Sequence, residues 1–212
     1  FFKVTFLSLF LISNQSFGSE RSSILQEIDF YILIDPDSQE VFSSNNPDAR
    51  ISPSSMTKVM TAYVVFDQIE KGLIGFNDEC RVGIEAWKRG GSSMFLNQGD
   101  VVSVDELLQG LLAVSGNDAA ISLAKTVSGS VDEFADLMND KASEIGLTNS
   151  QFKNPHGLHQ DGHYMSVRDL ATLTSRIYAD FPQYSHYLGI REFTYQNITQ
   201  RNRHPLIKKE YD

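Results

Sequence analysis

The chain has 212 residues, of which 41% are hydrophobic and 21% charged, and its formal net charge is -9. This composition is typical of a soluble globular protein of one domain or two small ones, with enough residues for a sizeable core. The acidic balance argues against a nucleic-acid partner, because phosphate binding needs a basic surface. The single cysteine, Cys80, excludes an intramolecular disulfide and a cysteine-based metal cluster.

The N-terminal residues predict an export signal. Lys3 precedes an apolar run, Phe6–Ile12, and Ser16 and Gly18 supply the small residues before a cleavage site. The run is shorter than the about 20 residues that span a bilayer. A hydrophobic first strand is the alternative interpretation. We expect residues 1–18 to be a signal peptide and the mature protein to be exported, to the periplasm or another extracytoplasmic location.

The following residues predict a β-hairpin, a long helical middle and one late strand. β-Branched and aromatic residues at 28–35, a turn at 35–38 and a return at 40–42 indicate the hairpin, and 45–53 is interpreted as a loop. Serine caps and apolar periodicity predict the helices. These are expected to begin near Ser55 and to cover 105–113, 118–127, 131–146 and 167–179, with strands at 79–84 and 192–198. The order predicts an α+β fold in which an antiparallel sheet packs against a helical cluster.

The central feature of the sequence is a serine and a lysine three residues apart at the start of an apolar helix. A Ser- and Pro-rich approach leads to Ser55 and Lys58, and no formal charge occurs between Lys58 and Asp67. The helix is therefore predicted to be buried on most sides. A serine hydroxyl needs a base to become a nucleophile, and burial can lower the pKa of a lysine enough for that role. A surface lysine that follows a capping serine is the alternative.

The Ser-x-x-Lys spacing also occurs at Ser122/Lys125 and Ser150/Lys153. Ser122 is expected inside a helix, where its hydroxyl would bond back to the preceding turn. Ser150 is expected in a loop, where the spacing has no geometric meaning. Only Ser55 is expected where a helix begins, with backbone N–H groups and the positive end of the helix dipole facing whatever its oxygen attacks.

A second polar element, Ser115-Gly116-Asn117, interrupts two otherwise apolar helices. It is interpreted either as a simple helix cap, since serine and asparagine favour such positions, or as a hydroxyl and an amide that project into a cleft facing Ser55. The same Ser-x-Asn spacing recurs within residues 43–46, which we interpret as a loop.

Together the two elements resemble the active-site serine penicillin-recognising enzymes, whose signature combines S-x-x-K, S-D-N and K-T-G. The resemblance is closer still to the low-molecular-weight D-alanyl-D-alanine carboxypeptidase family, and it runs from about Ile28 to Pro205. The similar segments are Ser52–Tyr63, Gly91–Leu96, Ser115–Ala120, Asn154–Leu158, His163-Tyr164 and Arg168–Ala171.

The resemblance implies a function for each matching residue. Ser55 would attack the carbonyl between the two terminal D-alanines of a peptidoglycan pentapeptide stem and form an acyl-enzyme, and Lys58 would accept its proton. Ser115 would relay a proton to the leaving amine, and Asn117 would bond the substrate amide and orient Lys58. The backbone N–H of Ser55 would be one oxyanion donor, and the loop at 91–96 would border the cleft. β-Lactams would be covalent inhibitors.

The sequence departs from the family in its third motif, because no lysine is followed by Thr-Gly or Ser-Gly. In the family that motif lies on a late strand, shortly after a segment like Gln200–Leu206. We therefore expect residues 19–212 to be a partial serine DD-peptidase catalytic domain, truncated before the later strands of a β-lactamase/transpeptidase-like fold and inactive as it stands. Some family members carry a C-terminal anchor, which implies association with the membrane surface.

Two other functions stay open. One is a DD-endopeptidase that cuts peptidoglycan cross-links, and the other is a non-catalytic exported module that binds the cell wall and lacks the third motif. We expect neither a cofactor nor a metal. His156, His159 and His163 fall in a polar loop without the helical spacing of a zinc protease, and we interpret them as solvated.

Overall fold

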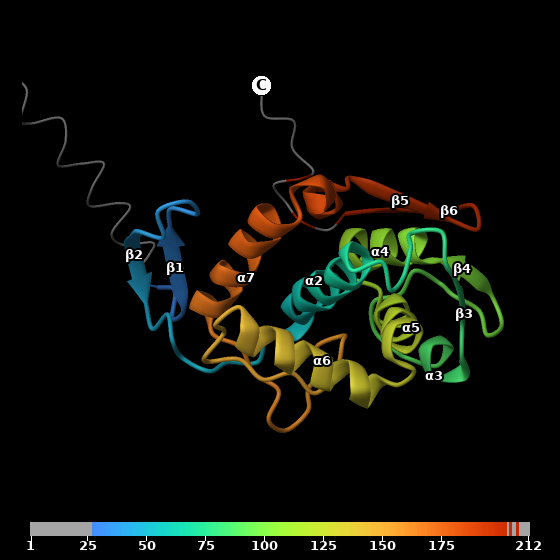
Figure 1. The fold of residues 1–212 in the computed structure, drawn as a ribbon, viewed down its shortest axis with the longest axis horizontal. Helices are drawn as coiled ribbons and strands as arrows, with labels where there is room; N and C mark the ends of the chain where they lie inside the picture. Colours follow the sequence, from blue (N-terminus) through green and yellow to red (C-terminus); the bar gives the residue numbers. More distant parts are fainter. Residues whose placement is uncertain (1–26, 203, 205–206, 208–212) are drawn as a thin grey trace, which may run out of the picture.

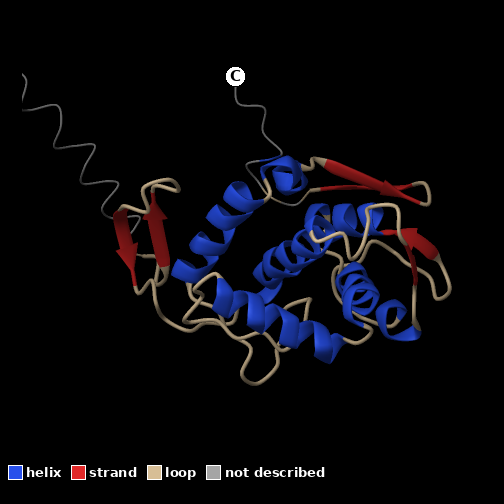
Figure 2. Ribbon diagram, viewed as in Figure 1, coloured by secondary structure: helices blue, strands red, loops and turns tan. Residues whose placement is uncertain are grey.

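The computed structural model describes residues 27–202, 204 and 207, and the predicted signal peptide lies outside them. Helices fill the middle of the molecule, and short antiparallel sheets lie at its edges (Figure 2). This is the expected α+β arrangement, although the strands form separate two-stranded sheets.

The elements are β1 (Tyr31–Ile34), β2 (Val41–Asn45), η1 (Ser54–Met56), α2 (Thr57–Glu70), β3 (Glu79–Arg81), α3 (Ile84–Trp87), β4 (Val101–Ser103), α4 (Val104–Ala113), α5 (Asn117–Ser128), α6 (Val131–Glu144), α7 (Val167–Asp180), η2 (Pro182–Gly189), β5 (Glu192–Tyr195) and β6 (Ile198–Arg201).

Helix α2 forms the centre of the core (Figure 1). It packs against α4, α5, α6 and α7, so that nearly every face of it is covered. The prediction of a helix buried on most sides is confirmed by its fully buried side chains, which include Met60, Ala62, Val64, Val65 and Phe66. Among the described residues, no helix is both long and apolar enough to cross a membrane.

Serine side chains fix where three of the helices begin. Ser103 accepts a bond from the backbone N–H of Glu106, whose carboxylate accepts one from the Ser103 backbone, which completes the predicted capping box. Ser130 and Ser166 likewise accept bonds from backbone N–H groups three residues later. Because α5 begins at Asn117, only a short junction separates it from α4, as the sequence predicts.

Two interpretations of the strands are wrong. The single strand predicted at 192–198 is a hairpin, because the chain turns at Gln196 and Asn197, which have φ values of 45° and 64°. Two adjacent polar residues, Gln196 and Asn197, interrupt the alternation between Tyr195 and Ile198, and asparagine is favoured in such turns, so the sequence carries a signal for this turn that the prediction missed. The second error is the loop assigned to residues 43–46, since most of it belongs to β2. Three further elements were not predicted, namely β4, the short helix α3 and the 3-10 helix η2.

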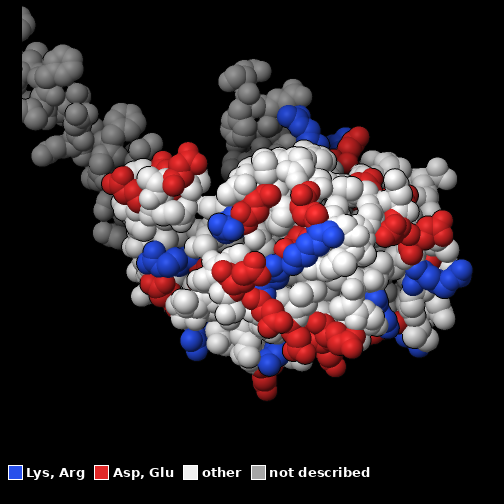
Figure 3. Space-filling view, in the orientation of Figure 1, with Lys and Arg blue, Asp and Glu red and all other residues white. Residues whose placement is uncertain are grey.

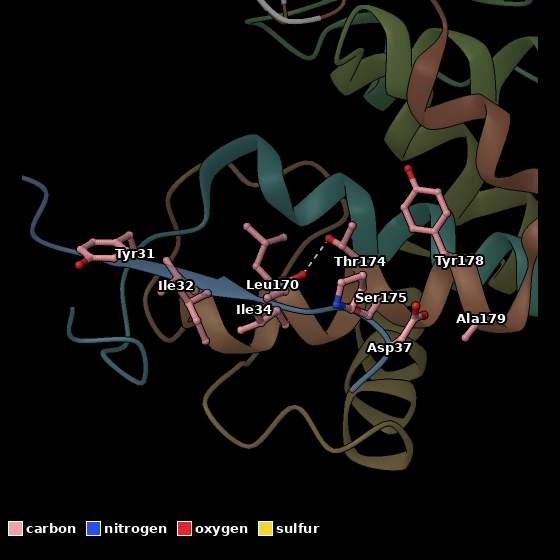
Figure 4. Close-up of a pocket in the computed structure, with 12 residues that line it drawn as sticks. Tyr31, Ile32, Ile34, Asp37, Leu170, Thr174, Ser175, Tyr178 and Ala179 are labelled. Carbon is pink, nitrogen blue, oxygen red and sulfur yellow. Dashed lines mark hydrogen bonds between the residues drawn. The ribbon is translucent and has the colours of Figure 1, made fainter. Parts of the chain in front are cut away.

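The β1–β2 hairpin lies against α7 at one end of the molecule (Figure 1). Between β1 and α7 is a hollow of about 800 Å³ (Figure 4). Its walls are largely apolar and include Ile32, Ile34 and Leu170. None of the residues that line it belongs to the predicted site, so this hollow is a feature of the hairpin and not of the Ser55 region.

The outward face of α6 is acidic (Figure 3). Five exposed carboxylates follow one another along it, and they are Asp132, Glu133, Asp136, Asp140 and Glu144. Part of the negative charge expected from the composition therefore lies along α6, where it generates a local negative potential.

Phe66→Ala should lower the free energy of unfolding by about 3–5 kcal/mol, because the side chain is fully buried and contacts the rings of Phe181 and Tyr184. Phe42→Ala is a matched control, since Phe42 is 60% exposed on β2, and it should change this free energy by less than about 0.5 kcal/mol. Urea denaturation measures both. Equal losses would contradict the central position of α2 in the core.

Candidate active site

Ser55 and Lys58 lie where the chain enters the central helix. Ser55 is part of the turn η1 and is exposed, whereas Lys58 is in the first turn of α2 and only 2% exposed. The Nζ atom of Lys58 is 3.5 Å from Oγ of Ser55. Ser54, just before them, has φ 47°, a conformation that is uncommon for a residue with a side chain. The structure therefore places an accessible hydroxyl over a buried amine.

Two acceptors besides Ser55 hold the amine of Lys58. Its Nζ donates to Oδ1 of Asn117 at 2.8 Å and to the backbone carbonyl of His156 at 2.7 Å. A neutral amine has two N–H bonds and one lone pair. When both N–H bonds point to these acceptors, the lone pair is left to face the hydroxyl of Ser55. The geometry suits Lys58 as the base that accepts the proton of Ser55.

The surroundings of Lys58 favour the neutral amine that this role needs. Burial lowers the pKa of Lys58 from its ordinary value to about 8, and the negative charge of Asp118 partly opposes the shift. Near neutral pH, an appreciable fraction of the amine is therefore unprotonated and able to act as a base.

The side-chain amide of Asn117 has a fixed orientation. Its Nδ2 donates to the carbonyl of Gly90 at 2.8 Å, and its backbone N–H donates to the carbonyl of Ser92 at 2.8 Å. A Cβ atom at Gly91, where φ is 90°, would lie 2.7 Å from Nδ2. Since Nδ2 of Asn117 faces the loop at Gly90, its Oδ1 faces Lys58. The side-chain amide thus links this loop to the amine of Lys58.

Asp118 anchors the same loop, and the sequence reasoning missed it. The side chain is 2% exposed. Its carboxylate accepts bonds from Oγ of Ser93 at 2.6 Å and from the backbone N–H groups of Met94 and Leu96, each at 3.1 Å. A charged residue directly after Ser-Gly-Asn, at the start of an apolar helix, was a signal that could have identified it. The loop at 91–96 is thereby fixed beside Asn117.

Ser115 lies at the junction between α4 and α5 with φ 61°. Its Oγ is buried and has no hydrogen-bond partner among the described residues. An unpaired buried hydroxyl and a left-handed backbone both cost free energy, and such features concentrate at functional sites. The structure brings Asn117 to Lys58 directly, whereas it shows Ser115 only as an unpaired hydroxyl at the same junction.

The histidine loop is not solvated as predicted. His156 and His163 are only 4% and 7% exposed, and of the three histidines His159 alone has an exposed ring. The sequence suggested solvent because the segment is polar, but its polar groups are paired inside the protein. The described residues contain no group of three or more His, Cys, Asp or Glu side chains that could hold a metal ion.

This loop packs directly on the Ser55 turn. The hydroxyl of Thr61 donates to the backbone carbonyl of Pro155 at 2.7 Å. One helical turn earlier, Lys58 donates to the backbone carbonyl of His156. Gly157 has φ 84°, and a Cβ atom there would lie 1.7 Å from the carbonyl oxygen of Ser54. Only a glycine allows this close approach.

The two rival Ser-x-x-Lys pairs do not form comparable sites. Ser122 lies inside α5 as expected, but its Oγ has no hydrogen-bond partner among the described residues, so the predicted bond to the preceding turn is wrong. Lys125 pairs instead with Glu85 at 3.2 Å. Ser150 lies in a loop and donates to Asp169 at 2.7 Å.

A serine hydroxyl that faces a buried lysine amine at the start of a helix is the arrangement of a serine nucleophile with a lysine base, the machinery of acyl transfer. Comparison with known proteins identifies the family. The sequence profile of the D-alanyl-D-alanine carboxypeptidases matches residues 21–212, and the chain belongs to this family.

Individual relatives agree with this assignment. The chain is 39% identical over 207 residues to D-alanyl-D-alanine carboxypeptidase DacC of Escherichia coli, which covers 94% of this chain and 52% of the relative. It is 38% identical to DacF of Bacillus subtilis, over 87% of this chain and 46% of the relative. Penicillin binding protein 5 from Haemophilus influenzae has a similar structure, with a TM-score of 0.82 and 38% identity over 84% of this chain and 53% of that chain. The chain thus spans about half the length of the curated relatives it matches.

Gly157→Ala should destabilise the protein far more than Gly146→Ala. Both glycines have a left-handed φ, which costs a residue with a side chain about 1–2 kcal/mol. A Cβ atom at Gly146 meets nothing within 4 Å, whereas one at Gly157 would collide with the Ser54 carbonyl. Chemical denaturation compares the two variants. Equal losses would show that the loop does not press on the Ser55 turn.

Proposed function

We propose that the protein is a serine-type DD-carboxypeptidase that removes the terminal D-alanine from peptidoglycan stem peptides through an acyl-enzyme on Ser55. The observation that carries this proposal is the amine of Lys58, whose two fixed acceptors leave its lone pair for Ser55. Membership of the D-alanyl-D-alanine carboxypeptidase family supports the same reaction.

The proposed reaction has two halves. In the first, Oγ of Ser55 attacks the carbonyl carbon of the last peptide bond while its proton passes to Nζ of Lys58. The backbone N–H of Ser55 stabilises the oxyanion and the C–N bond breaks. Ser115 relays the proton from Nζ of Lys58 to the departing amine of D-alanine, which returns Lys58 to its neutral form. In the second half, a water molecule gives a proton to the neutral amine of Lys58 and attacks the acyl carbon. The bond from this carbon to Oγ breaks, and the proton passes from Lys58 to Oγ, which restores both residues.

Asn117 has two functions in this scheme. Its Oδ1 orients Lys58 through the 2.8 Å bond. Its Nδ2 uses one hydrogen on the carbonyl of Gly90 and has a second with which to recognise the substrate amide. The loop at 91–96, which Asp118 anchors, would border the bound peptide.

The proposal extends to partners and location. Pentapeptide stems of peptidoglycan would be the substrate, and β-lactams would acylate Ser55 as covalent inhibitors. The substrate is extracytoplasmic, so the protein would work in the periplasm or an equivalent compartment, exported by a signal peptide at residues 1–18. Residues 19–212 would then be catalytic-domain sequence, and attachment to the membrane surface through a C-terminal anchor is part of the same proposal.

In the complete protein, Ser55→Ala should abolish covalent labelling by a fluorescent penicillin, because no other hydroxyl faces Lys58 in the described hydrogen bonds. Ser122→Ala is the matched control, since Ser122 has the same spacing to a lysine but lies buried within α5. That variant should label like the wild type. Gel fluorescence and mass spectrometry of the labelled peptide measure the outcome. Labelling that persists in the Ser55→Ala variant would refute the proposal that Ser55 is the nucleophile.

The acylation rate should rise with pH and level off above about pH 8, since only the neutral amine of Lys58 can accept a proton and its pKa is lowered to about 8. Well below that value the rate should fall about tenfold per pH unit, as the neutral fraction does. Stopped-flow acylation from about pH 6 to about pH 9 measures the profile. A rate that falls as pH rises would contradict Lys58 as the base.

Product analysis separates the proposed reaction from cutting of cross-links. Release of D-alanine from a pentapeptide stem would support the carboxypeptidase, and release of cross-linked stems as separate peptides would support an endopeptidase. Binding of both substrates without any product, together with no labelling by penicillin, would support a non-catalytic cell-wall module.

A further inference from the structure

His163 has no chemical step in the proposed reaction, yet it contacts the turn that carries Ser55. Its ring is 7% exposed, and Nε2 lies 2.8 Å from Oγ1 of Thr57. Thr57 is completely buried and stands between Ser55 and Lys58 in the sequence. A buried hydrogen bond to a residue between Ser55 and Lys58 can determine how the hydroxyl and the amine are positioned relative to each other.

The hydrogen bonds of the ring determine where its proton lies. Nδ1 accepts a bond from the backbone N–H of Lys153 at 2.9 Å, so this nitrogen carries a lone pair. In the neutral ring the proton is then on Nε2, and Nε2–H donates to Oγ1 of Thr57. Burial favours the neutral ring and lowers the pKa of His163 to about 4. Above that pH the donor to Thr57 is therefore present.

The same segment of chain reaches the site twice. His163 holds Thr57, and the backbone carbonyl of His156 holds the amine of Lys58. Two consecutive residues of α2 are thus fixed to one loop, which itself presses on the Ser54 carbonyl through Gly157. Loss of the Thr57 bond would free the first turn of α2 to shift against that loop. Such a shift would change the distance between the hydroxyl of Ser55 and the amine of Lys58.

We propose that His163 is a positioning residue of the Ser55 site, which acts by donating a hydrogen bond from Nε2 to Thr57 and so fixes the first turn of α2. This inference rests on the proposed function, because acylation of Ser55 is the step that it affects. It concerns a side chain that touches neither the hydroxyl nor the amine.

A pair of amide substitutions separates the two hydrogen bonds of the ring. The side chain of His163→Gln can extend to Thr57 and donate to it, whereas that of His163→Asn can accept from the Lys153 N–H but is too short to reach Thr57. His163→Asn should slow acylation by a fluorescent penicillin by at least about tenfold, since small misplacements of reacting groups are costly. His163→Gln should stay within about threefold of the wild type. His159→Asn, on the exposed ring of the same loop, should change nothing.

Thr57→Val tests the other end of the bond. It keeps the shape of the side chain and removes the acceptor, so it should slow acylation as much as His163→Asn. The double variant should be no slower than either single one, because both remove the same interaction. Additive losses, or a His163→Gln variant as slow as His163→Asn, would overturn the inference, and so would a His163→Asn variant as fast as the wild type.

The tautomer gives a readout that does not depend on activity. Long-range nitrogen–proton NMR of the intact wild-type protein should show the proton of His163 on Nε2, with the Thr57 amide signal shifted in His163→Asn. A proton on Nδ1 would overturn the inference even if the rates agreed. Failure of the complete wild-type protein to be acylated would refute the proposed function, and the positioning of Thr57 would then be decided by this spectrum alone.

Discussion

The buried amine of Lys58 is the group on which the rest of the site depends. Burying an amine costs free energy unless its N–H groups donate hydrogen bonds to acceptors inside the protein. Here the partners are a side-chain oxygen 59 residues away in the sequence and a backbone carbonyl 98 residues away. Tertiary packing, and not the local Ser-x-x-Lys spacing, therefore gives Lys58 the surroundings that its proposed role as a base requires. The two rival pairs show the contrast, since they have the spacing without the packing.

Stability and chemistry share one cause in this fold. Four helices enclose α2, and the burial that they provide is also what lowers the pKa of Lys58. A change that loosened the core around α2 would admit water to the amine and restore its ordinary pKa. The candidate site lies where the covered part of the helix meets its exposed entrance, so Ser55 is accessible while the amine of Lys58 is buried.

The sequence predicted what depends on local pattern. Capping serines, apolar periodicity and the break at Ser115–Asn117 located the helices, and the place of Ser55 and Lys58 at a helix start made them the predicted site. It did not predict contacts between distant segments. The backbone carbonyl of His156 carries no sequence signal, and the burial of His163 depends on partners such as the Lys153 N–H and Thr57. The turn within 192–201 does have a local signal, the adjacent polar pair Gln196-Asn197, which was overlooked.

Gly91 has a consequence for how the protein can evolve. Its backbone approaches the amide of Asn117 so closely that a Cβ atom would lie 2.7 Å from Nδ2. A replacement there would turn this amide and displace the amine of Lys58 that it holds, while Ser55 and Lys58 themselves stayed unchanged. The set of positions that selection must preserve is therefore wider than the set that performs chemistry. Inspection of the reactive side chains alone would mistake such a mutant for an intact protein.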